Sequence, residues 1–579
     1  MITTENINEI LDINESFQLY GALKSRLFDN KKREKMFNEF LKLETDLSYD
    51  WFTNYFQEEQ SNRKNMMQDY TPDCICKLLK ELNKNQENKS TFFDCCSGIG
   101  GLTISMWLDN KNKTFYLEEL SDNSMMVLLF NLSIRGINAY IRHGDVLTNE
   151  FKAIYKLTNS GQFSDIELIE NIDNDFKVDT IISNPPYSLK FDRIEEYKYD
   201  KRFANYGIPP KSKSDYAFIL HGLSHLNENG IMYFILPHGI LFRGSKEQEI
   251  RKNLINDNLI DTIIGMPENL FLNTTIPTCI MILKKNRNDN DILFVDGSNL
   301  FYKKGKNNFM DREHLNKIVS AYQLRENIDK LSHVATLEEI KENDYNLNIP
   351  RYVDTYEEQE PIDLEKQINE LSNIENEIHE IELSLSKQLR QIEGPNEYNA
   401  QRDKLASFME QKKHKTSTFI NDSINWFQTF EKQLSDIEIV NVLDVAKFER
   451  SKKNKVYPKG SIAIQVSATR GQLNYLKEDN TVSSKYGVFI VDETKINPRY
   501  LYYLIEMTIS DFLKKYQTGL NINPEIFLYY KISCHKNKEI QNMICQLMDS
   551  MQEIINLKEK NINHVKEVKE FHLDGMFPK

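Results

Sequence analysis

Cysteine and long apolar runs are both scarce in this sequence. No hydrophobic stretch approaches the roughly 18–20 residues of a membrane-spanning helix, and the polar, acidic start "MITTENINEI" is unlike a signal peptide. The seven cysteines fit no disulfide framework, and neither Cys74 with Cys76 nor Cys95 with Cys96 has the C-x-x-C spacing of a metal site. We therefore expect a cytoplasmic protein with no membrane segment and no metal site.

Positive charge is also in deficit, because the formal net charge is −13. This balance argues against a protein that coats nucleic acid with a uniformly basic surface, but it allows a local basic cleft. The chain has no GxxxxGK[ST] phosphate loop, which argues against a nucleotide-driven motor. The remaining composition, 40% hydrophobic and 27% charged, is that of an ordinary globular protein.

Strand-like and helical patterns alternate from Thr91 to about Asp296, after a charged and helical first 85 residues. Strands separated by helices predict an α/β fold with a doubly wound, mostly parallel sheet. The seven strands that we predict are 91–94, 114–118, 139–142, 178–183, 231–236, 260–265 and 277–284.

Long helices are predicted after about Pro361, where apolar residues recur every three or four positions. This is the pattern of a helix that packs on another helix. A second helix follows the break "EGPNEYN" and runs to about Leu434, and residues 438–535 return to short strands and turns. The two apolar stripes are Leu364, Ile368, Leu371, Ile374, Ile378, Ile381, Leu385, Leu389 and Ile392, and then Ile540, Ile544, Leu547, Met551, Ile554 and Val565.

The stretch "VDTIISNPPYSLKF", residues 178–191, places an unusual corner after a buried strand. Pro185 and Pro186 lack an N–H and have a fixed φ, so the chain after Ser183 is stiff and cannot extend the strand. Asn184 is thereby held at the carboxyl end of a strand, which is the edge where open α/β sheets bind ligands. The alternative is a plain strand-ending turn capped by Asn.

Three other predicted strands end in residues that could bind a nucleoside. "FFDCCSGIGG" puts Asp94 at a strand end, and its glycines allow backbone amides to approach a ligand closely. The next strand, "TFYLEEL", ends in Glu118 and Glu119, where an acid can hold both hydroxyls of a ribose. We predict Glu119, with Glu118 as the alternative one residue away. Asp145 in "HGDVL" lies where an adenine amino group could be contacted.

From about residue 50 to 355 the chain resembles the DNA adenine-N6 methyltransferases, and most closely the modification subunit of type I restriction-modification systems. The resemblance is carried by "QDYTPDCICKLL", "DCCSGIGGL", "YLEEL", "NLSIRGI", "HGDVL" and "SNPPYSLKF". It continues through "KSDYAFILHGLSHLNENGIMYFILPHGILFRGSKEQEIRKNLI", "GMPENLF" and "NDYNLNIPRY". These last segments are more specific to the family than the glycine loop.

The resemblance implies a seven-stranded methyltransferase sheet, S-adenosylmethionine as the methyl donor and double-stranded DNA as the substrate. The cofactor-binding residues that it implies are Gln68, Tyr70, Thr71, Pro72, Asp94, Gly98, Ile99, Gly100, Gly101, Glu119 and Asp145. The implied catalytic residues are Asn184, Pro185, Pro186 and Tyr187, with Asn184 orienting the target amine and Tyr187 stacking on an extruded base.

Residues 436–579 resemble half of a specificity subunit, with one target-recognition domain followed by a long spacer helix. "IVNVLDVAKFE", "NPRYLYYLI", "TGLNINPEIFLYYKIS" and "VKEFHLDGMFPK" carry this likeness. The predicted organisation is a helical N-terminal domain (1–85), a methyltransferase domain (86–355), spacer helices (356–435), a small α+β target-recognition-like domain (436–535) and a C-terminal spacer helix (536–579).

Two groups of cations are predicted to contact DNA phosphates. The first follows the Asn-Pro-Pro-Tyr corner, where cations alternate with Tyr197, Tyr199 and Tyr206, and the second lies in the recognition-like domain. The alternative for both is a solvated loop or hairpin. The residues that we predict to bind DNA are Lys211 and Lys213, and then Lys447, Arg450, Lys452, Lys453 and Lys455; Lys198, Lys201 and Arg202 belong to the first group, and Lys459 to the second.

The function predicted from these observations is site-specific methylation of adenine N6 in DNA, within a restriction-modification system. The protein partner is expected to be a second copy of the chain or a separate specificity subunit, with a restriction subunit as a further candidate. Two alternatives stay open. One is a modification subunit that is inactive without a specificity subunit, and the other is a non-catalytic DNA-binding module on the same scaffold.

Overall fold

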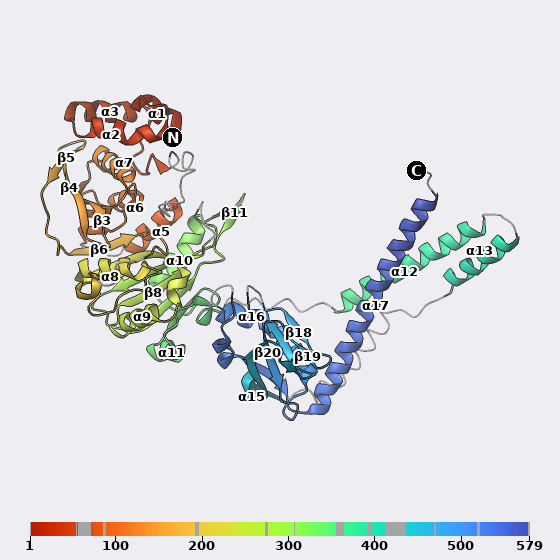
Figure 1. The fold of residues 1–579 in the computed structure, drawn as a ribbon. Helices are drawn as coiled ribbons and strands as arrows, with labels where there is room; N and C mark the ends of the chain where they lie inside the picture. Colours follow the sequence, from red (N-terminus) through yellow and green to blue (C-terminus); the bar gives the residue numbers. More distant parts are fainter. Residues whose placement is uncertain are drawn as a thin grey trace. The chain divides into compact units, whose positions relative to one another are not determined.

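The computed structural model divides the chain into two units, Met1–Thr355 and Tyr356–Lys579 (Figure 1). The described residues are 2–53, 55, 71–84, 89–190, 196–271, 276–305, 307–354, 364–391, 396–411, 436–467, 471–517 and 521–576. Among them, no helix is long and apolar enough to cross a bilayer.

In the described part of the first unit, eleven strands form one sheet in the order β13-β10-β8-β9-β7-β6-β1-β2-β3-β4-β5. The strands are β1 (Thr91–Asp94), β2 (Thr114–Glu119), β3 (Asn138–Asp145), β4 (Glu150–Asn159), β5 (Ser164–Ile169), β6 (Val178–Ser183), β7 (Leu226–Pro237), β8 (Ile260–Gly265), β9 (Thr278–Lys284), β10 (Ile292–Asp296) and β13 (Ser332–Ala335). A separate hairpin joins β11 (Tyr302–Lys304) to β12 (Asn307–Phe309).

The predicted doubly wound, mostly parallel core is confirmed, but the sheet is larger than the seven predicted strands. Those seven correspond to β1, β2, β3, β6, β7, β8 and β9, of which β9 runs antiparallel between β7 and β8. Four further strands extend the edges, with β4 and β5 beside β3, and β10 and β13 beside β8. The strand order reverses between β1 and β6, which pair in parallel. Ligands bind at the carboxyl ends of the strands at such a reversal.

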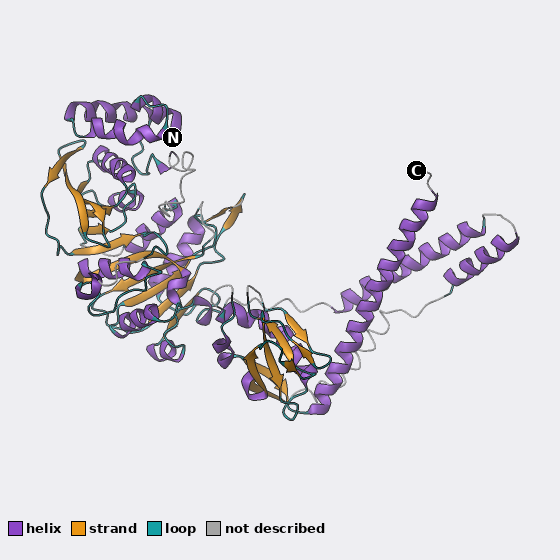
Figure 2. Ribbon diagram, viewed as in Figure 1, coloured by secondary structure: helices purple, strands orange, loops and turns teal. Residues whose placement is uncertain are grey.

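Helices cover both faces of the sheet, and strand alternation separates the two apolar layers (Figure 2). In β1, Phe92 belongs to one layer and Phe93 to the other. Burying a side chain of this size contributes about 1.5–3 kcal/mol, so a one-residue slip would be costly. The helices of the first layer are α5 (Asp73–Asn83), α6 (Gly101–Trp107), α7 (Asp122–Ile134) and α10 (Arg312–Leu324); those of the second are α8 (Asp215–His225), α9 (Lys246–Asn256) and α11 (Leu337–Glu342).

Three N-terminal helices pack on the same unit, beside α7 and β5 (Figure 1). They are α1 (Thr4–Leu11), α2 (Leu19–Leu27) and α3 (Asn30–Leu43). The buried Arg33 of α3 forms an ion pair with Asp165 of β5 at 2.7 Å. Arg135, which follows α7, donates to the backbone oxygens of Leu47 and Tyr49 at 2.9 and 2.6 Å. These contacts fix the N-terminal helices on the edge of the sheet that carries β4 and β5.

The second unit contains long helices and a small α+β region. The long helices are α12 (Leu364–Arg390), α13 (Asn396–Met409), α16 (Pro498–Tyr516) and α17 (Lys538–Met576), and a short helix, α15 (Val442–Val445), lies in the α+β region. A four-stranded antiparallel sheet has the order β15 (Ala446–Arg450), β20 (Tyr486–Val491), β17 (Ile462–Gln465) and β18 (Leu473–Tyr475); β14 (Ile437–Asn441) pairs with β21 (Lys531–His535), and β16 (Val456–Tyr457) with β19 (Asn480–Thr481).

Part of the apolar stripe predicted for the first long helix is exposed on α12, and Leu371 is half-buried. Ile374, Ile378 and Ile381 are 53%, 52% and 67% exposed. The predicted continuation of the second helix to Leu434 falls on residues 412–435, which lie outside the described residues.

Candidate active site

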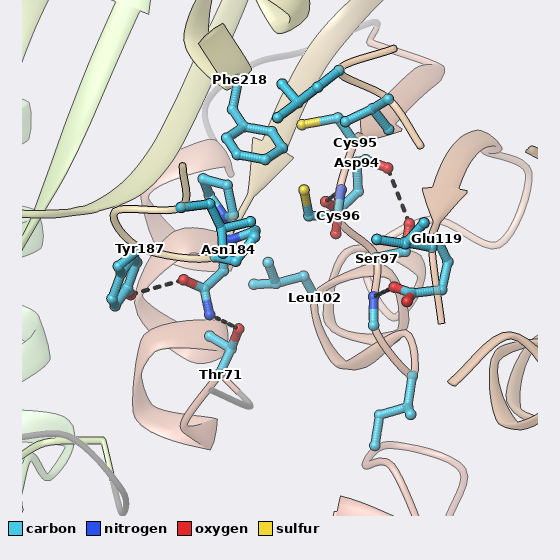
Figure 3. Close-up of a pocket in the computed structure, with 18 of the residues that line it drawn as sticks. Thr71, Asp94, Cys95, Cys96, Ser97, Leu102, Glu119, Asn184, Tyr187 and Phe218 are labelled. Atoms are coloured by element: carbon cyan, nitrogen blue, oxygen red, sulfur yellow. Dashed lines mark hydrogen bonds between the residues drawn. The ribbon is translucent and has the colours of Figure 1, made fainter. Parts of the chain in front are cut away.

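A cavity of about 430 Å³ lies at the carboxyl ends of β1, β2, β3 and β6 (Figure 3). The structure brings most of the predicted site residues to its wall: Thr71, Asp94, Gly98, Ile99, Gly101, Glu119, Asp145, Asn184, Pro185, Pro186 and Tyr187. Pro72 caps α5 just beyond Thr71, and Gly100 lies inside the loop. Gln68 and Tyr70 are outside the described residues.

The glycine loop between β1 and α6 depends on two left-handed residues, Gly98 at φ +56° and Gly100 at φ +93°. A Cβ on Gly100 would lie 2.9 Å from Leu128 Cδ1, in a backbone conformation that side chains rarely adopt. The loop can therefore turn tightly into α6 and leave the backbone of Gly98 and Gly101 at the cavity wall.

Asp94 lines the cavity with a buried carboxylate. Its Oδ1 accepts hydrogen bonds from Ser183 Oγ at 2.7 Å and from the Cys96 amide at 3.0 Å. Its Oδ2 is buried and has no hydrogen-bond partner among the described residues. Burial raises the pKa of Asp94 to about 7. An unpaired buried oxygen is costly, so this atom favours a ligand that brings a donor or a positive charge.

Glu118 and Glu119 point to opposite faces of β2. Glu119 lines the cavity, and its carboxylate accepts hydrogen bonds from the Gly98 amide at 2.8 Å and the Ser121 amide at 2.7 Å. Burial raises the pKa of Glu119 to about 7. Glu118 is fully buried in the other layer, where it pairs with Arg142 and lies 2.8 Å from His221 Nε2. The cavity-facing acid is therefore Glu119.

Asp145 ends β3 at the same cavity, and its side chain is fixed by the chain that follows. Its Oδ1 accepts a hydrogen bond from the Leu147 amide at 2.9 Å. Val146 and Leu147 themselves form part of the cavity wall.

Asn184 lies between Thr71 and Tyr187 at the opposite side of the cavity from Glu119 (Figure 3). Its Nδ2 donates to Thr71 Oγ1 at 3.0 Å, and its Oδ1 accepts from the Tyr187 hydroxyl at 2.8 Å. Each of the two contacts holds the amide plane. Because a carbonyl oxygen has two lone pairs, Oδ1 can accept a second hydrogen bond from a ligand.

The Tyr187 ring is buried, with 7% of its surface exposed, and it packs edge-to-face against Phe271 with ring centroids 6.2 Å apart. The corner is also held from the next residue, since the Ser188 amide donates to Asp215 Oδ1 of α8 at 2.8 Å. Asp215 is in turn paired with Arg243 at 2.5 Å. The Asn-Pro-Pro-Tyr corner is thus attached to α8 as well as to β6.

The first group of predicted DNA-contacting residues divides into exposed and buried members. Lys211 is exposed and Lys213 is half-buried. Tyr197 is instead buried, and the Arg202 side chain, with 8% of its surface exposed, is paired with Asp200. The solvent-facing position expected for these two side chains is therefore wrong.

In the second group, Lys447, Arg450, Lys452, Lys453 and Lys459 are exposed on or near β15. Lys455 is half-buried and forms an ion pair with Glu449, which also lies 4.0 Å from Lys452.

Sequence reasoning missed several cavity residues. Phe218 of α8 covers the cavity from above in Figure 3, and Leu102, Leu120 and Lys190 also line it. Phe218 lies in the segment "KSDYAFIL", but almost every residue of α8 is buried, so periodicity could not show which one faces the cavity.

The chain belongs to the N-6 DNA methylase family, because residues 46–361, more than half of its 579 residues, match the model of that family. Residues 415–567 match the model of the type I restriction modification DNA specificity domain.

Curated relatives are similar over part of their length. The chain is 31% identical to the type I restriction enzyme MpnII methylase subunit of Mycoplasma pneumoniae, over 51% of this chain and 54% of that protein. It is 31% identical to the MjaVII methylase subunit of Methanocaldococcus jannaschii, over 67% of this chain and 68% of that protein. A solved methyltransferase subunit of a type I system from Streptococcus thermophilus is 36% identical, with a TM-score of 0.47 over 53% of this chain and 63% of that one. The chain thus spans about half the length of the first of these relatives.

Replacing Glu118 and Glu119 one at a time should show that the first stabilises the fold and that the second binds the cofactor. Glu118→Ala leaves Arg142 buried without its carboxylate, so the free energy of unfolding should fall by about 3–5 kcal/mol. Glu119→Ala should change stability much less and weaken S-adenosylmethionine binding by about 1–3 kcal/mol. Denaturant unfolding and titration calorimetry measure the two quantities. If Glu118→Ala, and not Glu119→Ala, selectively weakened binding in folded protein, the assignment of Glu119 would be wrong.

The affinity of the cavity for this cofactor should rise with pH. Burial raises the pKa values of Asp94 and Glu119 to about 7, so the folded, empty protein holds protons that the unfolded chain loses above its lower carboxyl pKa values. The stability due to these protons is present at low pH and is lost as pH rises toward 7. A ligand that binds the ionised carboxylates should therefore bind about tenfold more tightly per group at about pH 8 than at about pH 6.

Calorimetry at several pH values measures this dependence. In Glu119→Gln it should fall to roughly the contribution of Asp94 alone. An affinity that does not change with pH in the wild-type protein would contradict the assignment of either carboxylate as a ligand.

Proposed function

We propose that the chain is an S-adenosylmethionine-dependent methyltransferase that modifies adenine N6 in double-stranded DNA, as part of a type I-like restriction-modification system. The observation that carries the proposal is a single cavity with two ends. One end holds the carboxylates of Asp94, Glu119 and Asp145, and the other end holds Asn184 on its proline corner. Membership of the N-6 DNA methylase family supports the same chemistry.

The residues at the first end fit the cofactor. Glu119 is an ionisable acceptor suited to ribose hydroxyls, and Asp145 to an amino group of an adenine ring. The Asp94 Oδ2, which has no partner among the described residues, suits the positively charged amino-acid part, and Leu102, Leu120 and Phe218 supply apolar wall. When bound, S-adenosylmethionine supplies an electrophilic methyl group.

The residues at the second end suit an aromatic amine. The lone pair of an adenine amino nitrogen is delocalised into the ring, so the amine is a poor nucleophile. Acceptance of its two hydrogens by Asn184 Oδ1 and the Pro185 carbonyl would turn the lone pair toward the carboxylate end of the cavity. Because Thr71 and Tyr187 already hold the Asn184 amide, little reorganisation is needed.

Tyr187 has two parts in this proposal. Its hydroxyl donates to Asn184 and so helps to fix the amide before the base arrives. Its ring would stack on the base once the base has left the duplex, because the target nitrogen cannot be reached inside the stack. The ring packs on Phe271, so base entry requires this contact to change.

The second unit is proposed to read DNA sequence. The match of residues 415–567 to a specificity domain and the cations around β15 support this role. One such domain reads only half of a two-part target. A second copy of the chain, packed through the exposed isoleucines of α12, would supply the other half, and the target would then be symmetric and interrupted.

Asn184→Ala should abolish methyl transfer and leave cofactor affinity nearly unchanged, because the side chain orients only the amine. Transfer of labelled methyl groups to unmethylated DNA and cofactor titration would be measured on the same preparation. Thr71→Ser, which retains a hydroxyl beside Asn184, serves as the matched control and should keep most of the activity. Activity of Asn184→Ala within a few-fold of wild type would refute the mechanism.

Replacing Lys452, Lys453 and Lys455 together by Ala should weaken DNA binding and reduce the slope of log affinity against log salt by up to about two units, because Lys455 is already paired with Glu449. Cofactor affinity should not change. Replacing Lys558, Lys560 and Lys566 of α17 removes the same charge from exposed positions outside the group and should leave the slope nearly unchanged. Equal slopes in wild type and the first variant would assign DNA recognition to a separate specificity chain.

A further inference from the structure

The segment Glu196–Phe203, which follows the Asn-Pro-Pro-Tyr corner and begins with the 3-10 helix η3 (Glu196–Tyr199), has two different faces. Tyr197 and Phe203 are buried in the core layer beneath α8, with ring centroids 5.6 Å apart. Lys198, Tyr199 and Lys201 are exposed, and Tyr199 has 89% of its surface in contact with solvent. One face of the segment is thus anchored in the protein and the other presents cations and an aromatic ring.

Arg202 is the polar member of the buried face, and every one of its five N–H groups has an acceptor. Nε and Nη2 donate to the Asp200 carboxylate at 3.0 and 2.6 Å. Nη1 donates to the Val146 carbonyl at 2.7 Å and lies 3.0 Å from His221 Nδ1, and Nη2 also donates to the Leu147 carbonyl at 2.8 Å.

The two carbonyls that Arg202 holds belong to the cavity wall. Val146 and Leu147 line the cavity, and the Leu147 amide donates to Asp145 Oδ1. The same short stretch of backbone therefore receives hydrogen bonds from Arg202 and orients the Asp145 carboxylate. A shift of this backbone by a fraction of an ångström would move both the wall and the acid.

The contacts behind Arg202 form a charge-balanced group. If Nη1 donates to His221 Nδ1, then the proton of a neutral His221 is on Nε2, which faces Glu118 Oε2 at 2.8 Å. Glu118 is paired with Arg142, and Arg202 with Asp200. Lysine could make only part of this arrangement, because an ammonium has three donors and no planar fork.

We propose that Arg202 is a positioning residue, which sets the wall of the cofactor cavity and the Asp145 carboxylate from a segment whose other face meets DNA. The inference rests on the proposed function, because it assigns S-adenosylmethionine to the cavity. DNA bound to Lys198, Tyr199 and Lys201 would stabilise the same segment that holds the Val146–Leu147 backbone. Binding of DNA and of the cofactor would consequently reinforce each other through Arg202.

The first experiment measures S-adenosylmethionine affinity by calorimetry for wild type, Arg202→Met and Arg202→Lys. Loss of the fork should weaken binding by about tenfold in Arg202→Met, and Arg202→Lys should recover part of the loss. The matched control is Arg251→Met. Arg251 is also buried, and it donates to the carbonyls of Tyr345, Ile240 and Arg243 at 2.8–3.1 Å, none of which lines the cavity. The control should lower stability but leave the affinity of folded protein within about twofold.

The second experiment uses exposed positions, so folding is not at risk. Lys198→Ala, Tyr199→Ala and Lys201→Ala are combined, and cofactor affinity is measured with and without DNA from a host that lacks N6-methyladenine. Affinity without DNA should equal that of wild type, and the gain on adding DNA should be reduced. In Arg202→Met the gain should be lost as well, which a purely structural role would not cause.

The inference is overturned if Arg202→Met and Arg251→Met have the same cofactor affinity, or if the triple variant keeps the full gain on adding DNA. A wild-type protein that binds S-adenosylmethionine and methylates DNA under those same conditions shows that only the inference has failed. A wild-type protein that neither binds S-adenosylmethionine nor methylates DNA would refute the proposed function and the inference with it.

Discussion

The buried carboxylate of Glu118 is the constraint on which the site depends. It has no exposed surface, and it lies between Arg142 and His221 in the layer of α8, where it does not line the cavity. Burying such a group is expensive, and a buried ion pair is weak evidence for net stability. The ion pair of Glu118 with Arg142 instead fixes the register of β2 in the sheet. A strand places successive side chains on opposite faces, so pairing Glu118 on one face commits Glu119 to the cavity. A slip of one residue would lose the pair and empty the cavity of its acid.

The two ends of the cavity differ: one contains carboxylates whose burial is unfavourable, and the other contains an amide that is held rigidly. Asp94 and Glu119 are buried so deeply that the pKa of each rises to about 7, and one oxygen of Asp94 has no partner among the described residues. These are groups that a polar, positively charged ligand can stabilise. The Asn184 end differs, because Thr71, Tyr187 and the two prolines hold the amide with its hydrogen-bonding atoms already paired. The first end is thus suited to gaining affinity from a ligand, and the second to holding a weak nucleophile in place.

The sequence was sufficient to predict the seven core strands and about half of the residues on the cavity wall, because both follow from local patterns. β-branched runs that end in glycine, acid or Asn-Pro-Pro-Tyr mark strand ends, and strand ends of a parallel sheet meet at one edge. The hairpin of β4 and β5 was not predicted, because its residues are mostly exposed or half-buried. Charged side chains interrupt the alternation of apolar and polar residues that would indicate a strand. The choice between Glu118 and Glu119 needed the partners Arg142 and His221, which are distant in sequence. Arg202 was placed on the solvent side because a charge in a basic loop carries no local signal of an inward rotamer.

Arg202 also shows that the number of cations in the chain does not equal the number available to bind phosphate. A chain with net charge −13 can bind a polyanion only where cations are concentrated and not already neutralised. Arg202 forms an ion pair with Asp200, and Lys455 forms one with Glu449, so neither is a free counter-charge for phosphate. Lys198 and Lys201 in the segment of Arg202, and Lys447, Arg450 and Lys453 in the second unit, are exposed. Because each phosphate contact contributes through displaced counterions, the steepness of the salt dependence should follow the exposed cations and not the total count. Arg202 instead holds the Val146 and Leu147 backbone at the cavity wall, while Lys198 and Lys201 on the other face of the same segment are exposed for the DNA contact that we propose.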